Sequence, residues 1–288
     1  MPGLKEIRKR INSVKSTKQI TKAMKMVAAA KFRKAQARIT ELKPYAEKME
    51  MVLASLGGAV GSGHPLMEAR PVKKVEIVTI TGDRGLCGAF NTNVMKAATK
   101  LMKELESQGY QVSVSSIGKK GFDLFKRRGV ALRKYWSGLS GKITYAIAKE
   151  IATDLSENYI NGTYDELILV YNEFKSAVVQ RVRTFQLLPM APIKGEEKTA
   201  ESVDFIYEPN QQIIFDTLVP KNIEVQVFRA LLDSQAAEEG ARMTAMENAT
   251  KAANDMIARL TLKFNKARQE SITKELMDIV GGVEALKH

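Results

Sequence analysis

Three glycines in the segment Gly82-Asp-Arg-Gly85-Leu-Cys-Gly88 resemble a phosphate-binding loop. The segment follows a β-branched run and precedes a helical pattern, which is where a strand–loop–helix unit binds phosphate groups. However, its spacing is G-x-x-G-x-x-G, whereas a dinucleotide site requires G-x-G-x-x-G. No acidic residue ends the next predicted strand, where a ribose would need one. The pattern therefore favours a tight structural turn, and a dinucleotide-dependent enzyme is the alternative.

Other chemically versatile residues are few and scattered along the chain. There are two histidines, His64 and His288, and one cysteine, Cys87. These residues are too few for a convincing zinc site or a Ser-His-Asp triad. The adjacent Glu238 and Glu239 lie in a long helical pattern, and we expect them to be a solvated pair and not an acid–base dyad. The sequence therefore predicts no catalytic residue, no cofactor and no metal site.

The composition restricts the setting in which the chain works. A single cysteine cannot form an internal disulfide and is typical of a reducing compartment. The first thirty residues are basic throughout and lack the apolar core of a signal peptide. No stretch approaches the eighteen or so consecutive apolar residues of a membrane span. We therefore expect no signal peptide and no direct membrane span.

Positive charge is concentrated at the amino-terminal end. The net charge is +13, and residues 1–48 contain fourteen Lys or Arg against three acidic residues, which gives +11. Residues 221–288 contain ten basic and ten acidic residues, so this end is neutral. A basic segment of this kind can bind nucleic acid, acidic lipid or an acidic protein surface. A basic coiled-coil protein that binds nucleic acid is therefore an alternative, although it leaves the neutral end unexplained.

The two ends of the chain read as long helices. Residues 221–286 contain no proline and are rich in strong helix formers, and such a helix would be roughly 100 Å long. Its apolar residues form a narrow seam, which requires a partner helix. The first part of this seam is Ala249, Ala253, Met256, Leu260, Phe264 and Ala267.

Residues 3–43 are the predicted partner helix. Pro44 is expected to kink or interrupt it, although residues 45–56 have the apolar spacing to continue it. The glycine-rich segment 57–65 is expected to end it. Its apolar seam shifts register part-way, which would change the local winding of a coiled coil. The seam comprises Leu4, Ile7, Ile11 and Val14, and then Thr17, Ile20, Met24 and Val27. We expect the two terminal helices to pair antiparallel as a stalk.

Between the helices, the pattern alternates between strands and helices. Buried β-branched runs separated by helical stretches predict an α/β domain with a largely parallel sheet and the last strand at an edge. The fold class is thus α/β, with a long antiparallel coiled coil and a central Rossmann-like domain. The predicted strands are 75–80, 111–117, 166–172 and 178–188, and the predicted helices are 92–107, 120–127 and 143–160. The predicted domains are 1–60, 72–208 and 210–288, with a polar connection at 191–209.

Three stretches resemble the gamma subunit of the bacterial F-type ATP synthase. They begin at Ile7-Arg-Lys-Arg-Ile11 with Thr17-Lys-Gln-Ile-Thr21-Lys-Ala-Met24, at Thr81-Gly-Asp-Arg-Gly-Leu-Cys-Gly-Ala-Phe-Asn91, and at Phe264-Asn-Lys-Ala-Arg268-Gln269-Glu-Ser-Ile272-Thr273. Their order and spacing cover essentially the whole chain. One departure is the pair Gly281-Gly282 followed by Val283, where the family usually has Gly-Ala. Two adjacent glycines weaken a helix by up to about 1 kcal/mol each relative to alanine.

The resemblance implies a rotor shaft inside a ring of alpha and beta subunits, with the α/β domain beside the epsilon subunit and the c ring. It implies no catalytic site on this chain and no nucleic acid partner. The implied contacts to beta are Met24, Lys25, Arg268, Gln269, Thr273, Glu275 and Asp278. An apolar collar would contain Leu276, Ile279, Val283 and Leu286, and Tyr207 and Glu208 would face the c ring and epsilon.

The resemblance also implies a location. The cysteine-bearing insertion of the chloroplast type is absent, and the amino-terminal residues do not resemble a transit peptide. We therefore expect a bacterial protein bound peripherally at the cytoplasmic face of the cell membrane.

Overall fold

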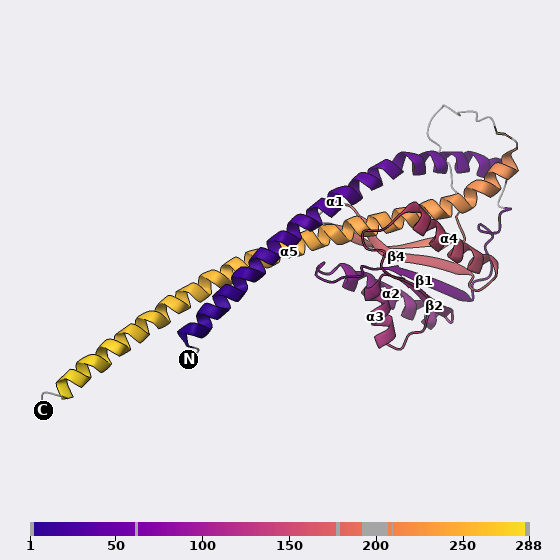
Figure 1. Cartoon of the computed structure of the whole chain (residues 1–288). Coiled ribbons are helices and arrows are strands. Elements are labelled where there is room, and N and C mark those ends of the chain that lie inside the picture. Colours follow the sequence, from indigo (N-terminus) through magenta and orange to yellow (C-terminus); the bar gives the residue numbers. More distant parts are fainter. Residues whose placement is uncertain (1–2, 61–62, 177–178, 192–206, 209, 286–288) are drawn as a thin grey trace. The chain divides into compact units, whose positions relative to one another are not determined.

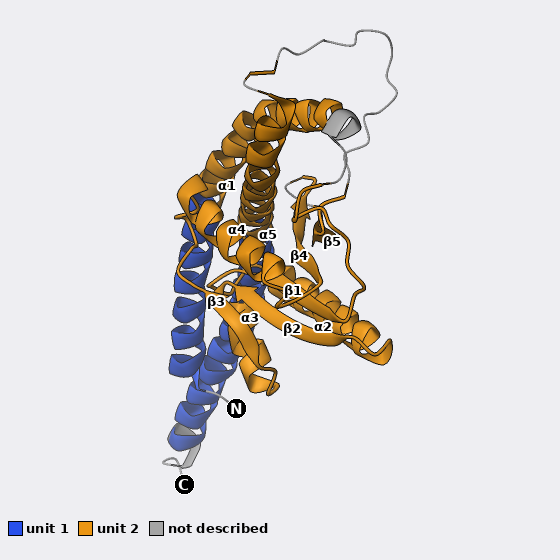
Figure 2. Ribbon diagram, turned by 90° about the vertical axis from the view of Figure 1, so that its right-hand side faces the viewer, with its two compact units in different colours: residues 1–27, 243–288 blue, residues 28–242 orange. Residues whose placement is uncertain are grey.

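The computed structural model describes residues 3–60, 63–176, 179–191, 207–208 and 210–285; for residues 57–60 and 283–285 it describes the backbone alone. The chain divides into two compact units, coloured separately in Figure 2. Unit 1 comprises residues 1–27 and 243–288, and unit 2 comprises residues 28–242. Both terminal helices contribute to both units, so the sheet-containing unit also holds one part of each helix.

Unit 2 is built on a five-stranded sheet with the strand order β3-β2-β1-β4-β5. Strands β1 (Lys74–Ile80), β2 (Gln111–Ile117), β3 (Leu132–Trp136) and β4 (Glu166–Phe174) are parallel. Strand β5 (Gln180–Leu188) pairs antiparallel with β4 at an edge. The largely parallel sheet and its edge strand confirm the sequence prediction, although residue 178 of that predicted strand lies outside the described residues.

Helices cover both faces of this sheet (Figure 1). On one face, α2 (Phe90–Ser107) and α3 (Lys119–Arg127) pack on alternate apolar residues of the strands, among them Val75, Ile77 and Val114. On the other face, α4 (Tyr145–Ile160) packs with parts of the two terminal helices on Val78, Ile80 and Leu169. Because β1 and β4 are covered on both faces, they contain nearly continuous apolar runs.

Strand β3 was missed by the sequence prediction. Its sequence, Leu-Arg-Lys-Tyr-Trp, contains two cations and alternates only weakly, as an edge strand can. The expected polar connection at 191–209 falls almost wholly outside the described residues.

The first terminal helix, α1 (Leu4–Val60), continues through Pro44, where a kink or an interruption was expected. Pro44 is solvent-exposed, and so is Thr40, whose carbonyl loses its helical partner. Water can therefore satisfy that carbonyl, and the predicted interruption does not occur. The helix ends at Val60, within the glycine-rich segment that was expected to end it.

The seam of α1 keeps one heptad register along its whole length. Every seventh residue from Ile7 to Leu56 is buried or half-buried, and so is every seventh residue from Leu4 to Leu53. The predicted register shift is wrong, since Ile20 and Val27 are 60% and 57% exposed. Polar residues occupy the seam where the shift was expected: Lys18, Thr21 and Lys25. Long lysine stems can cover an apolar seam while their ammonium groups stay in water.

The last helix, α5, spans Gln211–Ala285 and is 75 residues long. It begins ten residues before the predicted Lys221, with Asn210 capping it through a 2.9 Å bond from the Ile213 amide to Oδ1. Pro220 lies inside the helix and does not mark its start. No helix in the described part of the chain is long and apolar enough to cross a membrane.

Candidate functional site

The loop at residues 81–91 is held rigidly at the carboxyl end of β1. Asn91 accepts a 2.9 Å bond from the Gly82 amide and donates to the Arg84 carbonyl. Asp83 accepts from the amides of Lys119 and Ser140, at 3.0 and 3.1 Å. The loop therefore bonds to itself at the Gly82 amide and to the start of α3 and residue 140 through Asp83. The predicted structural turn is therefore what the loop forms.

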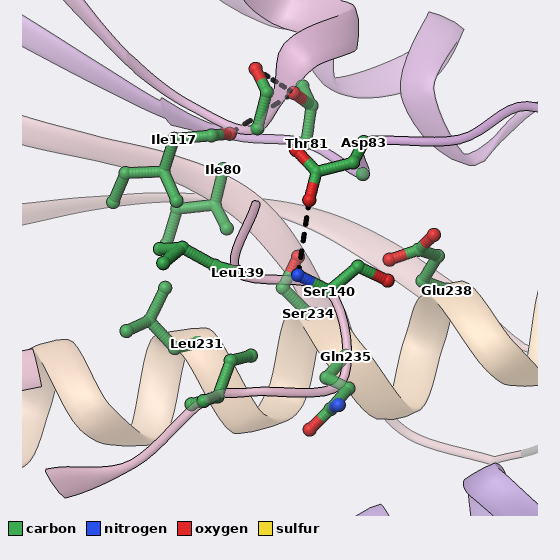
Figure 3. A pocket seen from close by; sticks show the side chains of 13 residues that line it. Ile80, Thr81, Asp83, Ile117, Leu139, Ser140, Leu231, Ser234, Gln235 and Glu238 are labelled. Atoms are coloured by element: carbon green, nitrogen blue, oxygen red, sulfur yellow. Dashed lines mark hydrogen bonds between the residues drawn. The ribbon is translucent and has the colours of Figure 1, made fainter. Parts of the chain in front are cut away.

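The Glu238 carboxylate of α5 packs against the same loop. A Cβ built on Gly82 would lie 2.6 Å from Glu238 Oε1, so the two groups are in close contact. The remaining cavity is about 30 Å³, which is room for a water molecule. Figure 3 shows Leu231, Ser234, Gln235 and Glu238 of α5 lining it. The geometry and the negative charge both oppose phosphate binding, so nothing here supports the dinucleotide enzyme.

Glu238 and Glu239 are not a solvated pair, contrary to the sequence prediction. They are only 6% and 4% exposed. Arg242 binds both carboxylates, and Lys31 of α1 lies 3.9 Å from Glu239. Burial raises the pKa of the Glu238 carboxyl, and the Arg242 hydrogen bond opposes that rise. The cluster is thus a buried ionic anchor between the helices of unit 2 and the loop.

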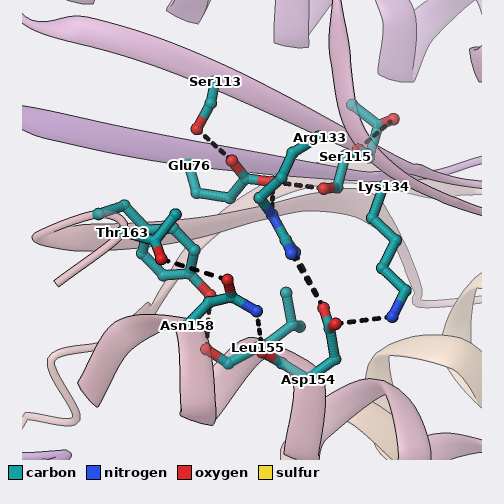
Figure 4. A network of polar contacts seen from close by, with 11 residues as sticks. Glu76, Ser113, Ser115, Arg133, Lys134, Asp154, Leu155, Asn158 and Thr163 are labelled. Carbon is teal, nitrogen blue, oxygen red and sulfur yellow. Dashed lines mark hydrogen bonds and ion pairs between the residues drawn. The ribbon is translucent and has the colours of Figure 1, made fainter. Parts of the chain in front are cut away.

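A second buried network ties the edge strand β3 to the sheet. Glu76 is fully buried in β1 and accepts hydrogen bonds from Ser113 and Ser115 (Figure 4). Arg133 lies 3.1 Å from both Glu76 and Asp154, so β1, β3 and α4 share one ionic network. Its members satisfy one another, which marks a structural role.

Unit 1 is a pair of helices formed by the first turns of α1 and the second half of α5. Thr21 and Thr250 share a 2.8 Å hydrogen bond across the pair. The ammonium group of Lys25 lies 3.2 Å from the Glu247 carboxylate. Near the start of α1, the Arg8 guanidinium lies 5.6 Å from the ring centre of Phe264. Lys25 is therefore partly engaged within the pair, and Met24 is half-buried beside it.

Beyond Phe264, α5 becomes exposed. The predicted contact residues Arg268, Gln269, Thr273, Glu275 and Asp278 are all solvent-exposed. The structure brings them together on about three turns of one helix.

Large apolar side chains are exposed on the same turns. Ile272, Leu276 and Ile279 are 49%, 57% and 63% exposed, and Val280 is 62% exposed. Their spacing places all four on one side of the helix. We call these four residues the apolar stripe. The sequence prediction included Leu276 and Ile279 but missed Ile272 and Val280, which the same i, i+4, i+7, i+8 spacing would have found. Of the other predicted collar residues, Val283 has only its backbone described and Leu286 lies outside the described residues.

The predicted foot residues lie in unit 2. Tyr207 donates or accepts a 2.7 Å hydrogen bond with Ser55 of α1 and packs against the larger core. Glu208 is exposed. Tyr207 is thus anchored in the domain while its neighbour faces solvent.

Comparison with known proteins shows the family to which the whole chain belongs. Residues 3–286 match the ATP synthase family ATP-synt. The chain is 46% identical over 291 residues to the ATP synthase gamma chain of Trichlorobacter lovleyi, with both chains fully covered. It is 48% identical over 292 residues to that of Chlorobaculum parvum, again with full coverage of both.

Solved structures show the same fold. The central stalk and c-ring structure of the Tetrahymena thermophila mitochondrial ATP synthase contains a chain that is 28% identical, with a TM-score of 0.61. The match covers 80% of the present chain and 99% of the other. A chain in the Euglena gracilis mitochondrial enzyme, 20% identical, matches with a TM-score of 0.66 over 98% of this chain and 94% of its own. The chain belongs to the ATP synthase gamma chain family, in its bacterial type.

Proposed function

We propose that this chain is the central rotor shaft of a bacterial F-type ATP synthase, coupling rotation of the c ring to ATP synthesis and hydrolysis. The observation that carries the proposal is the exposed end of α5, where the apolar stripe and charged residues share a few turns. A free helix end with four large apolar side chains in water is costly, unless another protein surrounds it. A ring of alpha and beta subunits supplies such a surface.

The proposed contacts to beta are Met24 and Lys25 on α1 together with the exposed polar residues of α5. Those residues are Arg268, Gln269, Thr273, Glu275 and Asp278. The proposed collar combines the apolar stripe with Val283 and Leu286. At the domain end, Tyr207 and Glu208 would face the c ring and the epsilon subunit. The Tetrahymena structure is described as a central stalk with c ring, which supports these partners.

The chain itself would be non-catalytic. In support, the loop at residues 82–88 is occupied by side chains of its own unit and is closed by Glu238. ATP synthesis and hydrolysis would take place on the beta subunits, and the shaft would determine which catalytic site is open. An asymmetric helix pair presents different side chains at different angles, so it can shift the open–closed equilibrium of each beta subunit by differential contact energy. Bound through the c ring, the chain would be peripheral to the cytoplasmic face of the cell membrane.

The contact residues can be tested in an assembled complex. Arg268, Gln269 and Thr273 are all exposed, so a triple alanine variant should keep the helicity and stability of the chain. We expect it to lower ATPase activity when co-assembled with alpha and beta, and to lower ATP synthesis in the complete membrane-bound complex.

A matched control changes three exposed residues of α2, namely Lys96, Lys103 and Glu106, to alanine. This control should leave the ATPase activity of the alpha–beta–gamma complex unchanged. Undiminished ATP synthesis in the Arg268, Gln269 and Thr273 variant would rule out these contacts.

A further inference from the structure

A cavity of about 320 Å³ lies within unit 2, where α1, the end of β4 and α5 meet. Its apolar wall consists of Ile39, Leu42, Ala46, Phe174 and Leu232. Its volume corresponds to roughly ten water molecules, which is also enough for a small organic molecule.

Charged groups from all three elements face this cavity, and two of its four acids, Glu47 and Glu173, form ion pairs. On α1, Glu47 lies 3.6 Å from Lys43. At the end of β4, Glu173 lies 3.2 Å from Lys175 and 3.0 Å from Arg183 of β5. These carboxylates are therefore compensated by cations of their own surroundings.

Two carboxylates facing the cavity are not compensated in this way. Asp233 of α5 is only 6% exposed; the charges of Arg229, Arg183 and Lys175 act on its carboxylate, but none of these described cations forms an ion pair with it. Glu50 of α1 accepts one 3.3 Å hydrogen bond, from the neutral Gln226 amide. Arg229 also lines the cavity but forms no ion pair with any described residue. These charges offset the cost of burying Asp233 only in part, so its carboxylate and that of Glu50 can still accept hydrogen bonds from a cation in the cavity.

We propose that this cavity binds a small organic cation, an ammonium group on a short apolar stem, with Asp233 as its counterion. The ammonium group would donate to Asp233 and Glu50, and the stem would lie on the apolar wall. A metal ion fits less well, because no group of three or more potential ligand side chains among the described residues is arranged to hold one. Such a ligand would connect α1 to α5 beside the sheet and would stabilise that junction.

The proposal predicts a pH dependence of binding. Burial raises the pKa of Asp233 to about 6, with Arg229 opposing the rise. The counterion is thus mostly neutral at pH 5 and ionised at pH 7.5, and affinity for a cation should increase between these values. The other charged groups around the site are Lys43, Glu47, Glu50, Glu173, Lys175, Arg229 and, on β5, Arg183.

The test is isothermal titration of the full-length chain with n-butylammonium at pH 7.5. Asp233→Asn removes the charge at nearly constant volume, so it should not prevent folding. The matched control is Asp216→Asn, on the exposed side of the same helix. 1-Butanol tests whether the apolar stem alone is sufficient.

We expect saturable binding of n-butylammonium to the native chain and to Asp216→Asn, weakened at least about tenfold in Asp233→Asn. 1-Butanol should show no saturable binding. Equal affinity in the native chain and Asp233→Asn would overturn the proposal. The absence of saturable binding to the native chain at millimolar n-butylammonium would overturn it as well. Either failure would leave the rotor assignment unaffected, since that assignment depends on the other end of α5.

Discussion

Replacing Asp233 by asparagine should stabilise this protein at neutral pH. The residue is 6% exposed, and the cations near it act on its carboxylate through their charges. Burial raises its pKa from 3.8 to about 6, while the nearby Arg229 opposes the rise. Folding therefore disfavours the ionised form, and the amide, which carries no charge, avoids that cost.

The size and sign of the effect follow from these two pKa values. Below about pH 4 the carboxyl is protonated in both the folded and the unfolded chain, so its ionisation costs nothing. As the pH rises from 4 to 6, the unfolded chain loses this proton first, and the folded state loses stability relative to it. Above about pH 6 the cost is constant at about 3 kcal/mol, from about two pKa units at 1.36 kcal/mol each.

Urea denaturation of the full-length chain at several pH values would measure this cost. We expect Asp233→Asn to be more stable than the native chain at pH 7.5 and equally stable near pH 4. Asp216→Asn changes an exposed aspartate on the same helix whose hydrogen-bond partner, Gln212, is also exposed, so it should stay within about 0.5 kcal/mol of the native curve. A stability difference that is zero at pH 7.5, or that is the same at both pH values, would refute the reasoning.

Three other substitutions test separate parts of the structure. Gly118→Ala should lower the free energy of unfolding by several kcal/mol, because the new Cβ would lie 2.0 Å from a backbone oxygen at a φ of +96°. Its control is Gly109→Ala, at φ +87° in open space, which should cost only about 1 kcal/mol in the same urea assay. Lys25→Ala should change the unfolding free energy by less than about 1 kcal/mol, because its ion pair is partly exposed; a larger loss would mean that this pair is a major support of unit 1. Replacing both Leu276 and Ile279 by serine should leave the urea midpoint of the isolated chain unchanged, since both side chains are exposed. The same double change should lower the ATPase activity of the assembled complex. Unaltered activity would exclude both residues from the collar.

The α/β domain could be predicted well because its signals are local. β1 and β4 are covered on both faces, so their apolar runs are unmistakable in the sequence. Strand β3 was hidden because its charged residues, Arg133 and Lys134, are satisfied by Asp154 on α4. Asp154 is about twenty residues away in sequence, so a local sequence pattern does not reveal that it pairs with β3.

In the terminal helices, the spacing of apolar residues alone predicts the wrong seam. Ile20 and Val27 look like seam residues, yet they are exposed, while Thr21 occupies the seam and bonds to Thr250. A polar residue in a seam is recognisable only when its partner on the other helix is known.

Burial of a charge is equally hidden in the sequence. Glu238 looks solvated, but it is buried against Arg242 and the Gly82 loop, which lies far away in the chain.

The central claim is that the exposed end of α5 is the part of the rotor that acts on the catalytic subunits. The most direct test is the ATPase activity of an alpha–beta–gamma complex in which this chain ends after Gln269, compared with the full-length chain. The truncation removes the apolar stripe and leaves the contacts of Thr21, Lys25 and Arg8 in unit 1 intact. We predict that the complex still assembles and that its ATPase activity falls. A complex with full activity after this truncation would contradict the account.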